Sequence, residues 1–284
     1  MAEKQLRILV FGAHPDDCDI KAGGVAALYV QLGHKVKFVS VTNGDAGHHE
    51  MGGGPLARRR YKEAQAAAAV IGIAYQLLDN HDGELEPTLE NRYQIIRLIR
   101  EFKPDLVMTP RPNDYHPDHR YTSILVQDAA YMVTVPNVCA LTPHLDYNPV
   151  IVYTSDGFTK PYPFKPDVVV GIDSVVEKKL DMLHCHESQF YEWLPYNAGI
   201  LDQVPTGAAE RRRWMGERRL RGFKAIANTH RDLLIELYGE EQGTQIQYAE
   251  AFEGCEYGAP LTGKNKQVLF PFFPKSAGLS LSKS

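Results

Sequence analysis

Two short loops carry the residue types that bind metals and move protons. Residues 12–17 read Gly-Ala-His-Pro-Asp-Asp, and residues 115–119 read Tyr-His-Pro-Asp-His. Imidazole and carboxylate are common zinc ligands, and the spacing of His14 and Asp17 allows both side chains to turn toward one ion while Asp16 points elsewhere. Because each loop follows an apolar run, the two clusters are expected to converge, and together they predict a metal site.

The first loop has two other possible interpretations. A dinucleotide-binding loop would carry G-x-G-x-x-G at this place, and two carboxylates would repel a phosphate. Alternatively, Asp16 and Asp17 cap the helix that follows, as acidic residues do well at a helix N-terminus. Capping explains the aspartates but neither His14 nor the second cluster.

The elements that must position these loops alternate between strand and helix. Apolar runs bounded by glycine or proline predict strands, and segments rich in helix formers that end at glycine predict helices. Strands are expected at 6–12, 36–44, 74–79, 105–110, 151–156 and 167–173, with helices at 23–33, 57–72, 91–102 and 210–239. This alternation favours an α/β fold with a mostly parallel, helix-covered sheet, in which ligands bind beyond the carboxyl ends of the strands.

The composition is that of a globular protein. Hydrophobic residues make up 44% of the 284 residues and charged residues 23%. No repeat or linker divides the chain, so we expect one domain spanning 1–284, with an irregular C-terminal tail from about residue 255.

Charge and cysteine usage bound the partners and the compartment. The net charge of −4 is spread over both signs, which argues against a nucleic-acid partner. The first apolar run is too short for a signal peptide or a membrane span. The four cysteines are far apart and form no C-x-x-C pair, so we expect a cytoplasmic protein without disulfides.

The paired A-H-P-D-D and H-P-D-H segments resemble the LmbE-like, or PIG-L, family of metal-dependent N-acetylglucosamine deacetylases. Weaker matches are Arg60-x-x-Glu63, Asp82-Gly83, His186-x-Ser188-Gln189 and the segment 248–252. The resemblance runs from about residue 6 to about residue 253 and implies a Rossmann-like fold with helices on both sheet faces. One departure is Asp19, where the family often has glutamate.

The resemblance also implies residue roles. His14, Asp17 and His119 would bind the metal, and Asp16 would act as general base. His116 would stabilise the transition state, oriented by Asp118.

Arg60 and Asp82 are expected to bind substrate, with a surface salt bridge as the alternative for Arg60. Two imidazoles and one carboxylate suit zinc but also accept Fe²⁺, Co²⁺ or Mn²⁺.

These residues suit amide hydrolysis, because one divalent metal both activates water and polarises the acyl oxygen. The resemblance therefore implies removal of the N-acetyl group from a GlcNAc-type sugar or conjugate, a small-molecule substrate. The alternatives are an amidase acting on a thiol or other natural-product conjugate, and a catalytically idle metal-binding or regulatory protein. The number of subunits stays open, with a homo-oligomer among the alternatives.

Two further segments need an interpretation. The glycine-rich loop 44–54 lacks the Gly-Lys-Ser/Thr ending of a phosphate loop and is expected to be a flap, with His48 and His49 solvated. The arginine-rich run 211–221 interleaves with Trp214 and Met215, which favours a solvated helix face over a nucleic-acid site. Tyr191, Trp193 and Tyr196 are candidates either to stack on a sugar or to pack.

Overall fold

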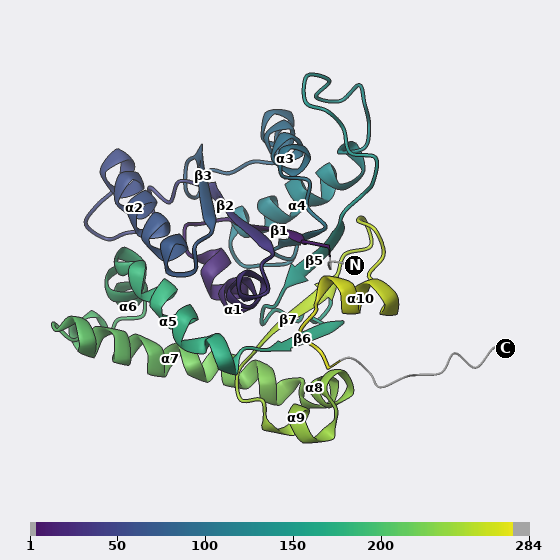
Figure 1. Ribbon diagram of the computed structural model, residues 1–284. Helices are drawn as coiled ribbons and strands as arrows, with labels where there is room; N and C mark the ends of the chain where they lie inside the picture. The colour runs from purple at the N-terminus through teal and green to yellow at the C-terminus, as the bar shows by residue number, and fades with distance from the viewer. Residues whose placement is uncertain (1–3, 275–284) are drawn as a thin grey trace.

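The computed structural model describes residues 4–274 and contains one seven-stranded sheet in the order β3-β2-β1-β4-β5-β7-β6 (Figure 1). Every neighbouring pair among β1 to β5 is parallel, and β7 runs antiparallel to both β5 and β6. The strands are β1 (Arg7–Gly12), β2 (Lys35–Thr42), β3 (Ala74–Asn80), β4 (Leu106–Thr109), β5 (Val150–Thr154), β6 (Val168–Gly171) and β7 (Ala249–Gly254). The predicted mostly parallel sheet is confirmed.

Helices cover both faces of this sheet. The α-helices are α1 (Asp17–Gln31), α2 (Gly53–Ile71), α3 (Leu89–Phe102), α4 (Pro117–Met132), α5 (Val176–Cys185), α6 (Leu194–Asn197), α7 (Ala208–Thr229), α8 (Arg231–Tyr238), α9 (Glu240–Gln245) and α10 (Gly263–Leu269). Short 3₁₀ turns form η1 (Asp173–Val175) and η3 (Leu201–Gln203), and η2 (Ser188–Trp193) is π-helical.

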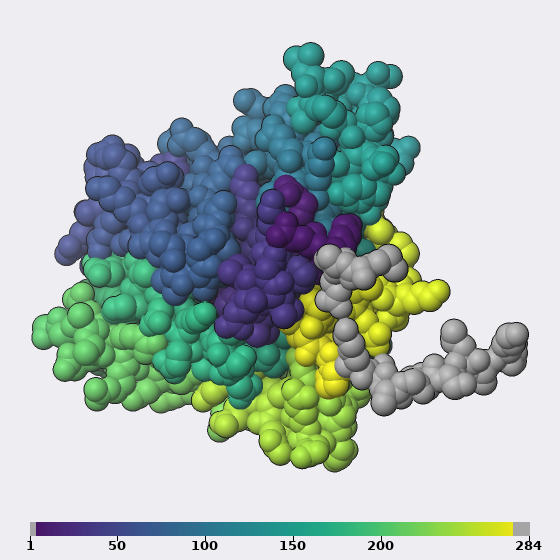
Figure 2. All heavy atoms as spheres, in the orientation of Figure 1, coloured from purple at the N-terminus to yellow at the C-terminus, as the bar shows by residue number. Residues whose placement is uncertain are grey.

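The alternation of side chains along each strand divides the core into two layers. Val10 of β1 packs with α1, α2, α5 and α7, whereas its neighbour Phe11 packs with α3 and α4. Figure 1 shows these two groups of helices on opposite sides of the sheet, and in Figure 2 the blue surface of α2 lies against the green surface that includes α5 and α6. Both apolar faces of the sheet are thereby removed from water.

The strand order reverses at β1. The chain steps from β1 outward to β2 and β3, then returns to place β4 on the other side of β1. Loops that leave the carboxyl ends of β1 and β4 diverge to opposite faces, and the crevice between them is where open α/β sheets bind ligands. The two sequence clusters follow these two strands.

Helix α1 begins earlier than its glycine-rich middle indicates. It starts at Asp17 and not near residue 23, so the loop after β1 enters the helix directly. The predicted helix 210–239 is divided at His230 into α7 and α8. In the tail, Thr262 and Asn265 form a capping box that begins α10, and residues 275–284 lie outside the described part of the chain.

A buried ion pair fixes α1 against the rest of the fold. The Lys179 ammonium lies 2.6 Å from Glu250 Oε1 and donates to the Ile20 carbonyl of α1. The Glu250 carboxylate accepts hydrogen bonds from the backbone N–H groups of Gly24 and Val25. A Cβ at residue 24 would stand 2.7 Å from Ile172 and 2.9 Å from Glu250, so glycine is needed for this close approach.

Within residues 4–274, no helix combines the length and the apolar character needed to cross a bilayer.

Replacing Glu250 by alanine is expected to lower the free energy of unfolding by about 3–5 kcal/mol, because it leaves the Lys179 charge buried without its partner. Urea unfolding of the metal-free protein measures this loss. Glu241→Ala, an exposed position on α9, is the matched control and should change stability by less than about 0.5 kcal/mol. Equal losses in the two variants would contradict a structural role for the pair.

Candidate metal centre

The loop after β1 is folded tightly around Asp17. Asp17 Oδ2 accepts hydrogen bonds from the backbone N–H groups of Ala13 at 2.9 Å and His14 at 2.8 Å. A Cβ at Gly12 would stand 2.7 Å from the Asp17 Cβ, so the strand must end in glycine for the carboxylate to turn back. Local hydrogen bonds thus fix the Asp17 carboxylate beside the His14 ring.

Three ligand atoms converge between the two loops. His14 Nδ1 lies 3.5 Å from Asp17 Oδ2, His119 Nε2 lies 3.4 Å from the same oxygen, and the two ring nitrogens are 3.3 Å apart. A tetrahedral ion bound at about 2.0–2.1 Å to each atom would separate any two of them by about 3.4 Å. The residues that the sequence predicts as ligands therefore form a triangle of the size that zinc requires, with one tetrahedral position left over.

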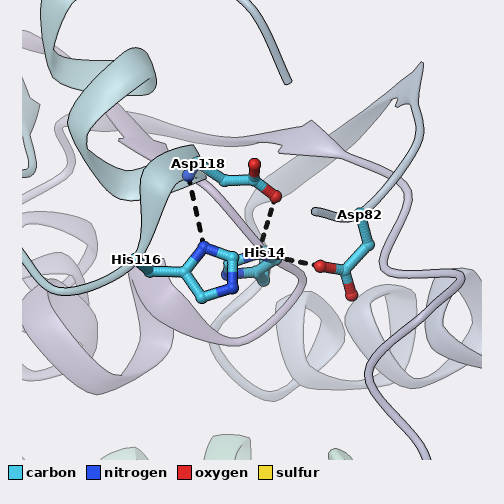
Figure 3. A group of neighbouring side chains, drawn as sticks. All are labelled: His14, Asp82, His116 and Asp118. Atoms are coloured by element: carbon cyan, nitrogen blue, oxygen red, sulfur yellow. Dashed lines mark hydrogen bonds and ion pairs between the residues drawn. The ribbon is translucent and has the colours of Figure 1, made fainter. Parts of the chain in front are cut away.

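The other side of the His14 ring faces two carboxylates (Figure 3). His14 Nε2 lies 3.1 Å from Asp82 Oδ1 and 3.2 Å from Asp118 Oδ2. A ring nitrogen between two carboxylate oxygens carries the proton, which leaves the lone pair on Nδ1 free to bind a metal. Asp82, His116 and Asp118 also form a ligand-like group with His14, but this hydrogen-bond pattern favours the Asp17 side for a cation.

The structure separates the Asp118 carboxylate from His116. The carboxylate contacts His14 and accepts hydrogen bonds from the backbone N–H groups of Gly83 at 2.7 Å and Leu85 at 3.3 Å. The link between Asp118 and His116 is instead a hydrogen bond from the Asp118 backbone N–H to His116 Nδ1 at 3.2 Å. Within residues 4–274 no hydrogen bond joins the Asp118 carboxylate to His116, so this backbone contact replaces the expected side-chain pairing.

His116 is the residue immediately before α4, and its ring caps the N-terminus of this helix. Because Nδ1 accepts the backbone hydrogen bond, the proton of the neutral ring is on Nε2. Burial, followed by the nearby charges of His14 and His119, holds the pKa of His116 below its ordinary value. His116 is therefore a neutral hydrogen-bond donor near pH 7.

His119 has an orienting carboxylate that sequence reasoning missed. Its Nδ1 lies 3.0 Å from Asp114 Oδ1, which also accepts the backbone N–H of His116. Although burial opposes it, the charge of Asp17 and the hydrogen bond to Asp114 raise the pKa of His119 to about 9. A signal was present in the sequence, since Asp114 lies in the same loop, two residues before the histidine cluster.

Asp16 differs from Asp17 in its backbone conformation, its hydrogen bonds and the direction of its pKa shift. It has a φ of 149°, which a residue with a side chain rarely adopts, and its side chain makes no capping hydrogen bond. Its backbone N–H donates to the Tyr75 hydroxyl at 3.2 Å, and no hydrogen bond to its carboxylate is found within residues 4–274. Burial and then the charge of Asp17 raise the pKa of Asp16 to about 6.

Arg60 is buried and does not form the surface salt bridge considered as its alternative. Its Nη2 donates to the carbonyl of Gly47 in the 44–54 loop, and its Nη1 lies 3.9 Å from Asp82 Oδ2. Asp82 Oδ2 also accepts the Gly47 N–H at 3.0 Å. The two residues expected to bind substrate thus hold the flap beside the proposed metal ligands, and substrate binding by them stays a prediction.

The two histidines of the 44–54 loop contact an acidic and an aromatic side chain near the proposed metal ligands. His48 Nε2 lies 2.7 Å from Glu192 Oε2, and the His49 ring stacks on Tyr196 with centroids 4.2 Å apart, so neither histidine is free in solvent. Tyr191 is buried and packs, whereas Tyr196 is about half exposed. The loop histidines and Tyr196 therefore form the rim of the flap.

Asp19, which departs from the glutamate that the family often has, forms an ion pair with His186. Its Oδ2 lies 3.1 Å from His186 Nε2, with both side chains fully buried beneath the loop. The charge of Asp19, opposing the effect of burial, raises the pKa of His186.

Replacing Asp114 by asparagine is expected to weaken zinc binding about tenfold, because the change removes the charge that orients and polarises His119 while keeping the size of the side chain. Competition with a chromophoric chelator measures the affinity. Asp146→Asn, the same change on an exposed loop, serves as the control. If both variants bind zinc equally, Asp114 does not support the metal ligand.

The chain is similar to known proteins across the segments that carry both clusters. The family model described as PIG-L, GlcNAc-PI de-N-acetylase, matches residues 9–130, a range that includes both clusters. The chain is 34% identical over 207 residues to diacetylchitobiose deacetylase of Thermococcus kodakarensis, covering 67% of this chain and 74% of that protein. It is 25% identical over 223 residues to 4-oxalmesaconate hydratase of Pseudomonas putida, covering 72% and 81%.

A solved structure shows the same fold. The N,N'-diacetylchitobiose deacetylase from Pyrococcus horikoshii superposes with a TM-score of 0.66 at 24% identity, covering 88% of this chain and 84% of that one. The sequence matches and the shared fold lead to one assignment: the chain belongs to the PIG-L, or LmbE-like, family.

Proposed function

We propose that this protein is a metal-dependent N-deacetylase that hydrolyses the acetamide of a GlcNAc-type sugar, releasing acetate and a free amine. The observation that carries the proposal is the triangle of His14, Asp17 and His119 beside an Asp16 carboxylate with no hydrogen-bond partner within residues 4–274. Membership of the PIG-L family and the 34% identity to a diacetylchitobiose deacetylase support the choice of substrate.

The donor set of the triangle fits a divalent cation, with zinc favoured among several first-row metals. When bound, such an ion supplies a Lewis acid for the acetyl oxygen and lowers the pKa of water. The chain holds the ligands in place through Asp82 and Asp118 on His14 and through Asp114 on His119.

Asp16 is the residue that accepts the proton of the attacking water. Its carboxylate lies outside the ligand triangle, and its raised pKa brings it closer to the value at which a general base works best. The positive φ of Asp16 is not a helical backbone conformation, so Asp16 lies outside the helix that begins at Asp17. This turn of the backbone separates the side chain of Asp16 from that of Asp17.

His116 is the residue that donates to the oxygen of the acetyl group. Its Nε2 carries the proton, because Nδ1 accepts the hydrogen bond from the Asp118 backbone. A fixed donor of this kind stabilises the negative charge that develops as water adds to the amide. Arg60 and Asp82, which hold the flap, are proposed to contact the hydroxyl groups of the sugar.

A second candidate function is hydration of an unsaturated acid, favoured by the 25% identity to 4-oxalmesaconate hydratase over most of that protein. The same general base would activate water for addition to a double bond. Deacetylation takes precedence because the identity to the deacetylase is higher.

We place the reaction in the cytoplasm, a proposal supported by four cysteines that are all free thiols.

Zinc-loaded protein is expected to release acetate from N,N'-diacetylchitobiose or N-acetylglucosamine, measured with a coupled acetate assay. Chelator treatment should abolish release, and zinc should restore it, because the ligand triangle has no function without a cation. Zinc-loaded protein that hydrates 4-oxalmesaconate and releases no acetate would favour the second candidate. Activity that is unchanged by complete metal removal would refute the metal-dependent mechanism.

The rate of deacetylation is expected to depend on the ionisation of Asp16. Only the carboxylate accepts a proton, so kcat/KM should rise with pH as Asp16 ionises and level off once its carboxylate form predominates. Asp16→Asn should lower kcat by about 100-fold or more and keep its metal content, because Asp16 supplies no atom to the triangle. A variant with more than about a tenth of the normal kcat would exclude Asp16 as the base.

A further inference from the structure

The arginine-rich part of α7 lines a pocket that shares no lining residue with the triangle of His14, Asp17 and His119. Arg212 pairs with Glu177 and Asp181, as a solvated helix face predicts. Arg218 and Arg219, in contrast, line a pocket of about 330 Å³, together with Arg221. Figure 1 shows α6 beside the first half of α7 at the lower left.

The floor of this pocket is apolar. Phe190 of η2, with Leu194 and Pro195 of α6, faces Trp214 of α7 across it. Two guanidinium groups lie over these rings: the Arg219 Cζ atom is 4.6 Å from the Phe190 centroid, and the Arg218 Cζ atom is 4.9 Å from that of Trp214. The attraction between a cation and an aromatic ring holds each guanidinium at the edge of the pocket.

No residue of the pocket lining compensates its positive charge, although the charge of Asp16 acts on Arg219. Its lining contains three arginines and no acidic residue. Within residues 4–274, Arg218, Arg219 and Arg221 form no ion pair and donate no hydrogen bond, although Arg219 is partly buried. Positions 218 and 221 are also neighbours on the helix surface, where like charges destabilise a helix. A group of arginines with no acidic residue in the same pocket is suited to an anionic ligand.

We propose that this pocket binds a small phosphate monoester carried on an apolar chain or ring. Phosphate brings about −1.5 to −2 charges near neutral pH, and the arginine fork matches its oxygens. The Phe190 and Trp214 rings take the apolar part of the ligand. The pocket volume lies at the lower end of the range for small-molecule sites. Because its lining includes none of His14, Asp17 or His119, this is a second site and its existence does not depend on the proposed deacetylase activity.

The protein contains two tryptophans, which allows a direct binding assay. In the Trp193→Phe variant, Trp214 is the remaining tryptophan and reports on the pocket. Hexyl phosphate, which does not absorb at the exciting wavelength, is expected to change this fluorescence in a saturable way. Hexanol and inorganic phosphate should each bind at least about tenfold more weakly, since each lacks one half of the proposed recognition. Calorimetry on the unmodified protein provides a second measurement.

Charge variants distinguish a specific binding site from general electrostatic attraction between α7 and the phosphate. Arg219→Gln should weaken hexyl phosphate binding about tenfold, and Arg221→Gln, at an exposed position, at least about threefold. Arg213→Gln removes the same charge from α7 outside the pocket and should change binding less than about twofold. Zinc-loaded and chelator-treated protein should bind alike.

Three results would overturn the proposal. They are the absence of saturable hexyl phosphate binding in both assays, an effect of Arg213→Gln as large as that of Arg219→Gln, and binding that disappears with the zinc. The last result would assign the phosphate to the metal centre. None of these results bears on acetate release, so failure of this proposal is distinguishable from failure of the proposed function.

Discussion

The site is organised around buried negative charge that positive charge on or beside the histidines must balance. Asp17 lies on one side of the His14 ring, and Asp82 and Asp118 lie on the other, all with little access to water. Burial opposes protonation of His14, but the hydrogen bonds to these carboxylates raise its pKa well above its ordinary value. Without a metal, protons on His14 and His119 supply the compensating positive charge. A bound cation must displace the proton at the ligating nitrogen, which links metal affinity to pH.

The same buried environment gives two adjacent carboxylates opposite properties. Burial raises the pKa of Asp16, whereas the charges and hydrogen bonds of His119 and His14 overcome burial and lower that of Asp17. Environments that separate the pKa values of neighbouring groups allow one to serve as proton acceptor and the other to stay ionised. The backbone turn at Asp16 makes this separation possible, since it directs the two side chains apart. Its conformational cost is borne by a loop that hydrogen bonds and Tyr75 hold in place.

Rigid supports far from the loop position these groups. The ion pair of Lys179 and Glu250 fastens the middle of α1, and α1 carries Asp17 at its first turn. The contact links strand β7, late in the chain, to a helix formed from its beginning. Antiparallel β7 therefore does more than extend the sheet: it supplies the side chain against which the metal-loop helix is seated.

The parallel β-α alternation and the two clusters can be predicted from the order of the residues, because buried strands and their polar loops leave local patterns. His14, Asp17 and His119 were predicted together and do converge, since consecutive βα units leave few topologies for loops at one sheet edge. Tertiary structure alone decided the reversed direction of β7, the partner of Asp118 and the pocket between α6 and α7. Those features depend on contacts between segments that are distant in the chain, for which the periodicity of the sequence carries no information. They also depend on which edge of an imidazole or guanidinium faces its neighbour.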